Sequence, residues 1–243
     1  MKFFTAVVFL SSLVFHTTAN AQQDFRPVLV NQSPENVFIP QDFDNNDNSQ
    51  VVIDGTFAST CYKTAPTEYV VNPDTKVITV RNRAYFYFSS WCAFMMVPYY
   101  QTVNLGILPE GRYEVKAEDE QGAAKPAGIL PVFYSKTVGP DDYLYAPVNE
   151  AILMDKKPNA KRTVLLRGAF TSTCMTLKEV KVVYRGNVVE ILPVAQMAEG
   201  SCLDKMVPFS KSVTIEQDLK GKNLLHVRSL SGQSINNVVN FDL

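Results

Sequence analysis

The side chains of this chain that most readily do chemistry belong to four cysteines and two histidines. His16 directly follows an N-terminal apolar run and belongs to a predicted signal peptide, which leaves His226 as the candidate base or metal ligand. It stands in "NLLHVRS", where alternation predicts a strand, and a lone strand histidine is more often a surface residue than a base. No Gly-x-Ser-x-Gly turn precedes it, and a histidine metal site needs further imidazoles. We therefore expect no catalytic residue and no enzyme activity.

An acidic segment, "QDFDNNDN" at residues 41–48, is the next candidate because its side-chain oxygens are spaced closely enough to hold calcium. The calcium-loop pattern, however, requires Gly where Asp47 stands and Glu where Ile53 stands. A solvated turn between strands is the better interpretation, and we expect no metal site. Catalytic carboxylates of glycosidases pair only in space, so a secreted carboxylate-dependent hydrolase stays as an alternative function. Without a phosphate loop or dinucleotide fingerprint, we expect no cofactor.

An internal repeat sets the organisation of the chain. "VVIDGTFASTC" ends at Cys61 and "VLLRGAFTSTC" ends at Cys174, while "CAFMMVPYYQTVNL" begins at Cys92 and "CLDKMVPFSKSVTI" begins at Cys202. Such self-similarity indicates a duplication, here of units of about 110 residues, an ordinary domain size. We predict a signal peptide at residues 1–21, domain 1 at residues 22–138, a linker at residues 139–147 and domain 2 at residues 148–243.

The repeat also selects one of the three ways in which four cysteines can pair. One pair in each copy, at equivalent positions, gives the bridges Cys61–Cys92 and Cys174–Cys202. Zinc is disfavoured because the spacings of 31 and 28 residues lack the close cysteine pairs of structural zinc sites. In an exported chain the bridges are oxidised, and each closes a loop of about 30 residues, worth roughly 3–4 kcal/mol.

Alternation along both copies predicts strands rather than helices. In the first copy Val51, Ile53 and Phe57 share one face, while Asp54 and Thr60 share the other. One buried and one solvated face is typical of an antiparallel sandwich. Fourteen Pro and eleven Gly, with 46% apolar residues, likewise indicate short strands joined by turns.

The segment "LPEGRYEV" at residues 108–115 resembles the Leu-x-x-Gly-x-Tyr-x-Val turn and strand of fibronectin-type and bacterial immunoglobulin-like domains. The resemblance implies that Tyr113 makes a corner hydrogen bond, whereas the second copy departs from the pattern with Asn223. The fold class predicted from all these features is all-β, with two tandem immunoglobulin-like antiparallel β-sandwich domains and one disulfide in each. A fold shared so widely carries no function with it.

The aromatic segment "RAYFYFSSWCAFMMVPYY" at residues 83–100 holds the chain's single tryptophan. It is too short, and too interrupted by Ser and Pro, to span a membrane. If Cys92 faces the core, alternation places Phe86 and Phe88 there as well. The second copy has no aromatic residue in this stretch, so the outward strip is the candidate surface for a sugar or protein ligand. One alternative is that domain 2 or residues 24–48 cover these rings, and another is simple exposure on a β-rich surface, which is normal for scattered residues. The candidate ligand-binding residues are Tyr85, Tyr87 and Trp91.

The N-terminus and the charge of the chain concern its location and partners. Lys2, the apolar run at residues 3–15 and Ala19-Asn20-Ala21 have the form of a cleaved secretory signal. Loss of Lys2 from 23 basic residues leaves 22 against 24 acidic ones, which excludes the basic patch of a nucleic-acid binder. We predict an exported protein, periplasmic or secreted, without a membrane span. Its expected role is non-enzymatic binding of a protein or glycan partner, with a structural or adhesion subunit of an envelope assembly as a further alternative.

Overall fold

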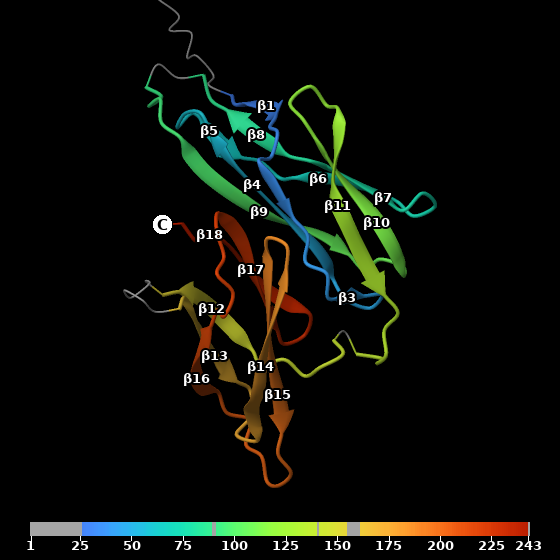
Figure 1. The fold of residues 1–243 in the computed structure, drawn as a ribbon, viewed down its shortest axis with the longest axis vertical. Helices are drawn as coiled ribbons and strands as arrows, with labels where there is room; N and C mark the ends of the chain where they lie inside the picture. Colours follow the sequence, from blue (N-terminus) through green and yellow to red (C-terminus); the bar gives the residue numbers. More distant parts are fainter. Residues whose placement is uncertain (1–25, 89–90, 140, 155–160, 243) are drawn as a thin grey trace, which may run out of the picture.

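The computed structural model describes residues 26–88, 91–139, 141–154 and 161–242. The predicted signal peptide lies outside these residues. The described chain is all-β and contains no helix, so no helix within it could cross a membrane. Figure 1 shows strands β1–β11 in the upper part of an elongated molecule and strands β12–β18 in the lower part. We call these parts the first half and the second half.

The first half holds three sheets, with the strand orders β1-β8-β5, β2-β4-β9 and β3-β11-β10-β7-β6. The sheets β2-β4-β9 and β3-β11-β10-β7-β6 pack face to face around one apolar core, which includes Val51 and Ile53 from the first and Ile78, Val115 and Leu130 from the second. The strands are β1 (Val28–Asn31), β2 (Asn36–Phe38), β3 (Phe43–Asp44), β4 (Ser49–Phe57), β5 (Tyr62–Thr64), β6 (Glu68–Asn72), β7 (Val77–Arg81), β8 (Arg83–Phe86), β9 (Val97–Gly106), β10 (Gly111–Glu118) and β11 (Ala124–Phe133).

The second half holds two sheets, with the orders β12-β13-β16 and β14-β15-β17-β18. They enclose a separate apolar core that includes Val164 and Leu166 from one sheet and Ile191, Leu225 and Val227 from the other. The strands are β12 (Val148–Leu153), β13 (Thr163–Phe170), β14 (Met175–Arg185), β15 (Val188–Met197), β16 (Val207–Thr214), β17 (Lys222–Ser229) and β18 (Gln233–Asn240).

The two halves share one strand topology, as expected of a duplication. The sheet β2-β4-β9 corresponds to β12-β13-β16, and the order β11-β10-β7-β6 corresponds to β18-β17-β15-β14. The sequence predicted antiparallel sandwiches, but both halves contain a parallel pair at the equivalent place, β7 with β10 and β15 with β17, and in the first half β3 also pairs parallel with β11. The reason is that the chain crosses to the opposite sheet between these strands and returns in the same direction.

The tyrosine corner implied by the resemblance is present. The buried Tyr113 hydroxyl donates a hydrogen bond to the backbone carbonyl of Pro109 over 2.9 Å, which ties strand β10 to the turn before it. In the second half the Asn223 amide takes this place and donates to the carbonyl of Lys220 over 2.9 Å. A different side chain thus holds the same turn, which is why the second copy tolerates the departure.

The halves are joined by an apolar contact that the sequence did not predict. Val52 of strand β4 and Phe38 of β2 pack against Val188 of β15 and Leu224 of β17, and all four are almost fully buried. The outer face of sheet β2-β4-β9 was expected to be solvated. Over strands β2 and β4 it is instead covered by the second half, and Asp54 of β4 is buried, while Tyr100 of β9 stays exposed.

Charged residues surround this contact, and they include the acidic segment at residues 41–48. The prediction of a solvated turn there was wrong, because Asp47 is buried and pairs with Arg228 of strand β17 over 2.8 Å. Arg228 also binds Asp141 of the linker over 2.5 Å, and Asp42 pairs with Arg185 over 2.6 Å. No cluster of three or more metal-binding side chains occurs in the described part of the chain.

His226 lies in the same junction and corrects a second expectation. The sequence predicted a surface histidine, but its side chain is 1% exposed and packs edge-on against Phe43 of the first half. Its Nδ1 lies 2.7 Å from the Asn236 side-chain oxygen. Burial lowers the pKa of His226 to about 4, so the imidazole is neutral near neutral pH. A buried residue of this kind joins the two halves and does not present a base to a substrate.

Candidate functional site

The two predicted disulfides are both formed. Cys61 is bonded to Cys92 and Cys174 to Cys202, with Cα–Cα distances of 5.3 and 5.4 Å. Each bridge ties the turn that follows the Gly-x-Phe strand, β4 or β13, to a loop that leads into the edge strand β9 or β16. We call the first of these loops, residues 87–96, the aromatic loop.

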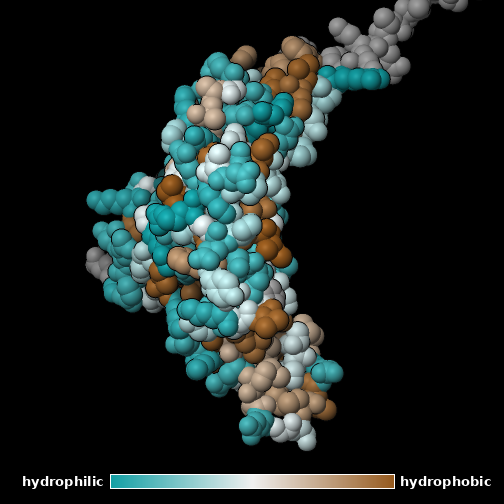
Figure 2. All heavy atoms as spheres, turned by 90° about the vertical axis from the view of Figure 1, so that its right-hand side faces the viewer, coloured by the Kyte–Doolittle hydropathy of each residue, from teal (hydrophilic) through white to brown (hydrophobic). Residues whose placement is uncertain are grey.

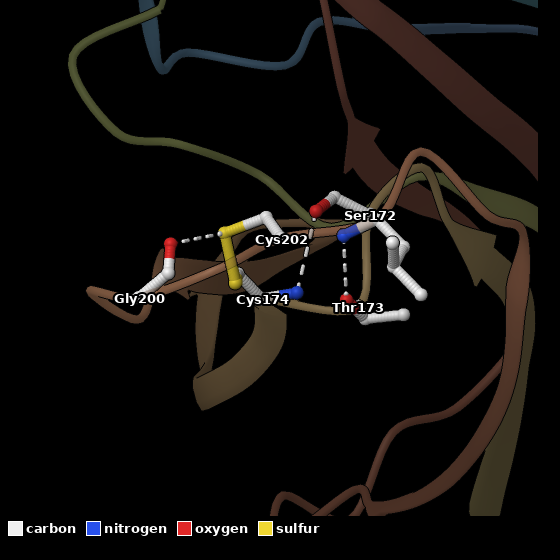
Figure 3. Close-up of a disulfide and its surroundings, with 6 residues drawn as sticks. Ser172, Thr173, Cys174, Gly200 and Cys202 are labelled. Carbon is white, nitrogen blue, oxygen red and sulfur yellow. Dashed lines mark hydrogen bonds between the residues drawn. A yellow bond between two sulfur atoms is a disulfide. The ribbon is translucent and has the colours of Figure 1, made fainter.

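Shared hydrogen bonds hold each loop next to its bridge. In the first half the Thr60 amide donates to the Ala93 carbonyl over 3.1 Å, and the Ala93 amide donates to the Thr60 hydroxyl over 3.0 Å. The second half repeats both bonds between Thr173 and Leu203 at the same distances, and Figure 3 shows the bonds that Thr173 and Ser172 make around the second bridge. The Ser-Thr-Cys part of the repeat therefore fixes the position of the loop through the disulfide and these hydrogen bonds.

The Gly and Phe residues of the repeat pack against the edge strand that follows each loop. The ring of Phe57 stacks on Tyr99 with centroids 4.2 Å apart, and Phe170 stacks on Phe209 at 4.4 Å. A Cβ atom at Gly55 would lie 2.5 Å from the Tyr99 hydroxyl oxygen, so only glycine leaves room for the stacked ring. These contacts fix where each loop leaves the sandwich.

The aromatic loop presents apolar side chains to solvent. The exposed fraction is 92% for Trp91 and 96% for Phe94. No charged residue occurs at residues 87–96 of the sequence. Exposed apolar residues gathered in one place mark contact surfaces more often than isolated ones do. Figure 2 shows apolar surface at the upper end of the molecule and again at the lower end. The exposed apolar members of the loop are Tyr87, Phe88, Trp91, Phe94, Met95 and Met96.

The three predicted ligand-binding residues differ in their exposure to solvent. Trp91 and Tyr87 are exposed, whereas Tyr85 is half-buried in strand β8, between β1 and β5. The rings are not covered by the second half, which packs on sheet β2-β4-β9 instead. Phe86 is half-buried against Tyr62, with ring centroids 4.8 Å apart.

The prediction that Phe88 lies in the core was wrong, because its side chain is 61% exposed. Strand β8 ends at Phe86, so alternation counted backwards from Cys92 does not hold across the loop. The same reasoning missed Phe94, Met95 and Met96, which follow the cysteine outside any strand. A comparison of the two copies was the available signal, since Asp204 and Lys205 take the places of Phe94 and Met95 in the second copy.

The loop offers contact area and no reactive group. Its side chains are aromatic, thioether or small, and none is an acid, a base or an unpaired thiol. Large rigid rings with flexible Met side chains are well suited to binding an apolar surface. The arrangement can therefore hold a partner by burying apolar area.

Comparison with known protein families matched residues 51–125 to the ORF11 beta-sandwich domain. This stretch runs from strand β4 to the start of β11 and includes the first disulfide and the aromatic loop. The comparison with curated proteins and the comparison with solved structures each found no match.

Proposed function

We propose that this chain is an exported, non-enzymatic binding protein made of two tandem immunoglobulin-like sandwiches, which captures a protein partner through the aromatic loop. The N-terminal signal pattern and the two disulfides support export to the periplasm or the extracellular space. A disulfide at Cys92 and two hydrogen bonds at Ala93 hold this part of the loop, so little conformational entropy is lost there on binding.

One observation carries the proposal. Asp204 and Lys205 stand in the second half where Phe94 and Met95 stand in the first, and all four side chains are exposed. The same loop geometry is thus compatible with charged residues, and folding does not require apolar ones there. Exposed apolar side chains that folding does not require are best explained by a contact with another molecule.

The composition of the loop favours a protein over a glycan. Sugar sites combine aromatic rings with charged or amide side chains that bond to hydroxyl groups, and residues 87–96 contain no such side chain. Protein interfaces are enriched in aromatic residues and Met at their centres. We therefore place the partner's apolar surface against Trp91 and Phe94.

The test uses an exchange that the chain itself supplies. In the double variant Phe94→Asp/Met95→Lys, the loop acquires the residues of the second copy. Because the exchanged side chains are exposed, the free energy of unfolding should change by less than about 0.5 kcal/mol per residue. The mature wild-type protein and the variant would each be immobilised to capture a partner from native envelope or extracellular material, and the identified partner would then be titrated.

We expect the double variant, and Trp91→Ala separately, to weaken partner binding by about 30-fold, as at an interface hot spot. Ile107→Ala is the control, since Ile107 is also an exposed apolar residue of the first half but lies outside the loop. A partner that binds all four proteins with equal affinity would show that the loop is not the interface. Turnover of a glycan or peptide by the purified protein would overturn the non-enzymatic assignment.

A further inference from the structure

A second feature, separate from the aromatic loop, is a cavity where the two halves and the linker meet. Its volume is about 500 Å³, within the size range of small-molecule sites. Its walls come from strand β3 and the loop after it, the segment after β11, the linker, and strands β14, β15 and β17. The cavity therefore exists only while the halves are joined.

Aromatic rings form much of the wall. Phe133, Tyr134 and Tyr143 line the cavity with exposed rings, and Tyr134 is 70% exposed. The Lys181 ammonium already lies 4.4 Å from the centroid of the Tyr143 ring. The rings of Phe133 and Tyr134 offer flat apolar faces on which the apolar face of a ligand can stack.

Tyr145 supplies a polar group that lacks a protein partner. Its side chain lines the cavity and is only 5% exposed, yet its hydroxyl makes no hydrogen bond within the described residues. Burial raises the pKa of Tyr145, so the hydroxyl stays protonated and can donate. The hydroxyl is therefore available to form a hydrogen bond with a ligand hydroxyl in the cavity.

Charged side chains of both signs line the same cavity. Asp44 and Asp142 provide carboxylate acceptors, while Lys136 and Lys181 provide ammonium donors. Lys181 also pairs with the exposed Glu179 over 3.4 Å, and Asp47 of the wall is held by Arg228. A ligand with several hydroxyl groups can bond to acceptors and donors that lie side by side. An ion would instead be selected by a wall whose charges all have one sign.

We propose that this cavity binds a small neutral saccharide, one or two sugar rings in size. One face of a sugar ring stacks on Tyr134 and Phe133, and its hydroxyl groups bond to Tyr145, Asp44 and the neighbouring lysines. This site is independent of the partner surface proposed for the aromatic loop, so the chain would bind two different kinds of ligand at two places.

The experiment is a titration of the full mature protein with glucose, N-acetylglucosamine, cellobiose and chitobiose, followed by calorimetry and saturation-transfer NMR. At least one of these sugars should bind. Tyr134→Ala, which removes an exposed ring, and Tyr145→Phe, which removes one hydroxyl, should each weaken that binding by about tenfold. Tyr69→Ala, an exposed tyrosine on strand β6, and Trp91→Ala should leave it unchanged.

Three results would overturn the proposal. The first is that none of the four sugars binds at concentrations up to about 10 mM, because the stacking and hydrogen bonds proposed for the cavity should give a dissociation constant below that value. The second is sugar binding that Tyr134→Ala and Tyr145→Phe both leave intact. The third is sugar binding lost in Trp91→Ala, which would place the glycan on the aromatic loop and contradict the protein partner proposed there. Failure of sugar binding alone leaves the loop proposal standing.

Discussion

Replacing Arg228 with Met should separate the role of its charge from the role of its packing. The guanidinium binds Asp47 over 2.8 Å and Asp141 over 2.5 Å, and all three side chains are more than nine-tenths buried. The Arg228 side chain also stacks on Phe43 and Tyr145, with its guanidinium carbon 5.4 and 5.5 Å from the ring centroids. Met keeps most of this apolar contact and removes the charge, so Asp47 and Asp141 are left buried without a counter-ion.

We expect Arg228→Met to cost about 3–5 kcal/mol at pH 8, the usual result of breaking a buried pair from one side. The cost should shrink at lower pH. Burial raises the pKa of Asp47 to about 6 even with Arg228 present, and the pKa of Asp47 rises further without the guanidinium. A raised folded-state pKa gives stability that is present at low pH and lost as pH rises through that pKa. The difference between wild type and variant should therefore be smaller at pH 5 than at pH 8.

The assay is chemical denaturation of both proteins at pH 5 and pH 8, with Arg167→Met as the matched control. Arg167 pairs with Glu150 over 3.2 Å, but both side chains are more than half exposed, so its loss should cost less than about 1 kcal/mol. Adding Asp47→Asn and Asp141→Asn to Arg228→Met should restore most of the stability, because no unpaired buried charge then remains. Equal losses at Arg228 and Arg167, or a loss at Arg228 that does not depend on pH, would refute the reasoning.

Two further predictions concern the repeat and the junction. A Cβ atom at Gly168 would overlap the Pro147 carbonyl oxygen and lie 2.9 Å from the Phe209 ring. Thermal melts should therefore show that Gly168→Ala lowers the free energy of unfolding by about 1–3 kcal/mol, while Gly139→Ala, with open space around it, leaves it unchanged. A Gly168→Ala protein as stable as the wild type would disprove the packing argument. Burial lowers the pKa of His226 to about 4 from 6.5, so its stabilising contribution is complete above pH 6.5 and is lost as pH falls toward 4. The stability of wild type relative to His226→Gln should therefore fall by about 2 kcal/mol between pH 6.5 and pH 5, and a pH-independent difference would mean that His226 is not buried as described.

The features that followed from the repeat were predictable from sequence. Two copies of one motif identify equivalent positions, so the pairing Cys61–Cys92 and Cys174–Cys202 needed no structural information. The corner hydrogen bond of Tyr113 and the all-β class depend on local pattern in the same way. Each of these features is set by residues close in sequence or by the duplication itself.

The contact between the halves could not be predicted, because alternation shows which residues share a face and not what covers it. Strand β4 carries apolar side chains toward its own core and also toward the second half, so nearly all of its residues are buried. Asp54 and the acidic segment at residues 41–48 have the composition of solvated groups. Their partners, such as Lys222 for Asp54 and Arg228 for Asp47, lie far along the chain and only the fold brings them close.

The candidate site was predictable in part, and the reason lies in the difference between the copies. Alternation failed at Phe88 because it assumes a continuous strand, and β8 ends at Phe86. A comparison of the two copies predicts the site better than alternation does, because a residue found in one copy shows what the shared fold tolerates at the equivalent position of the other. Folding explains why both copies keep Gly, Phe, Ser, Thr and Cys around the disulfide. It does not explain why one loop carries Phe94 and Met95 where the other carries Asp204 and Lys205, and the binding surface that we propose for the first half does.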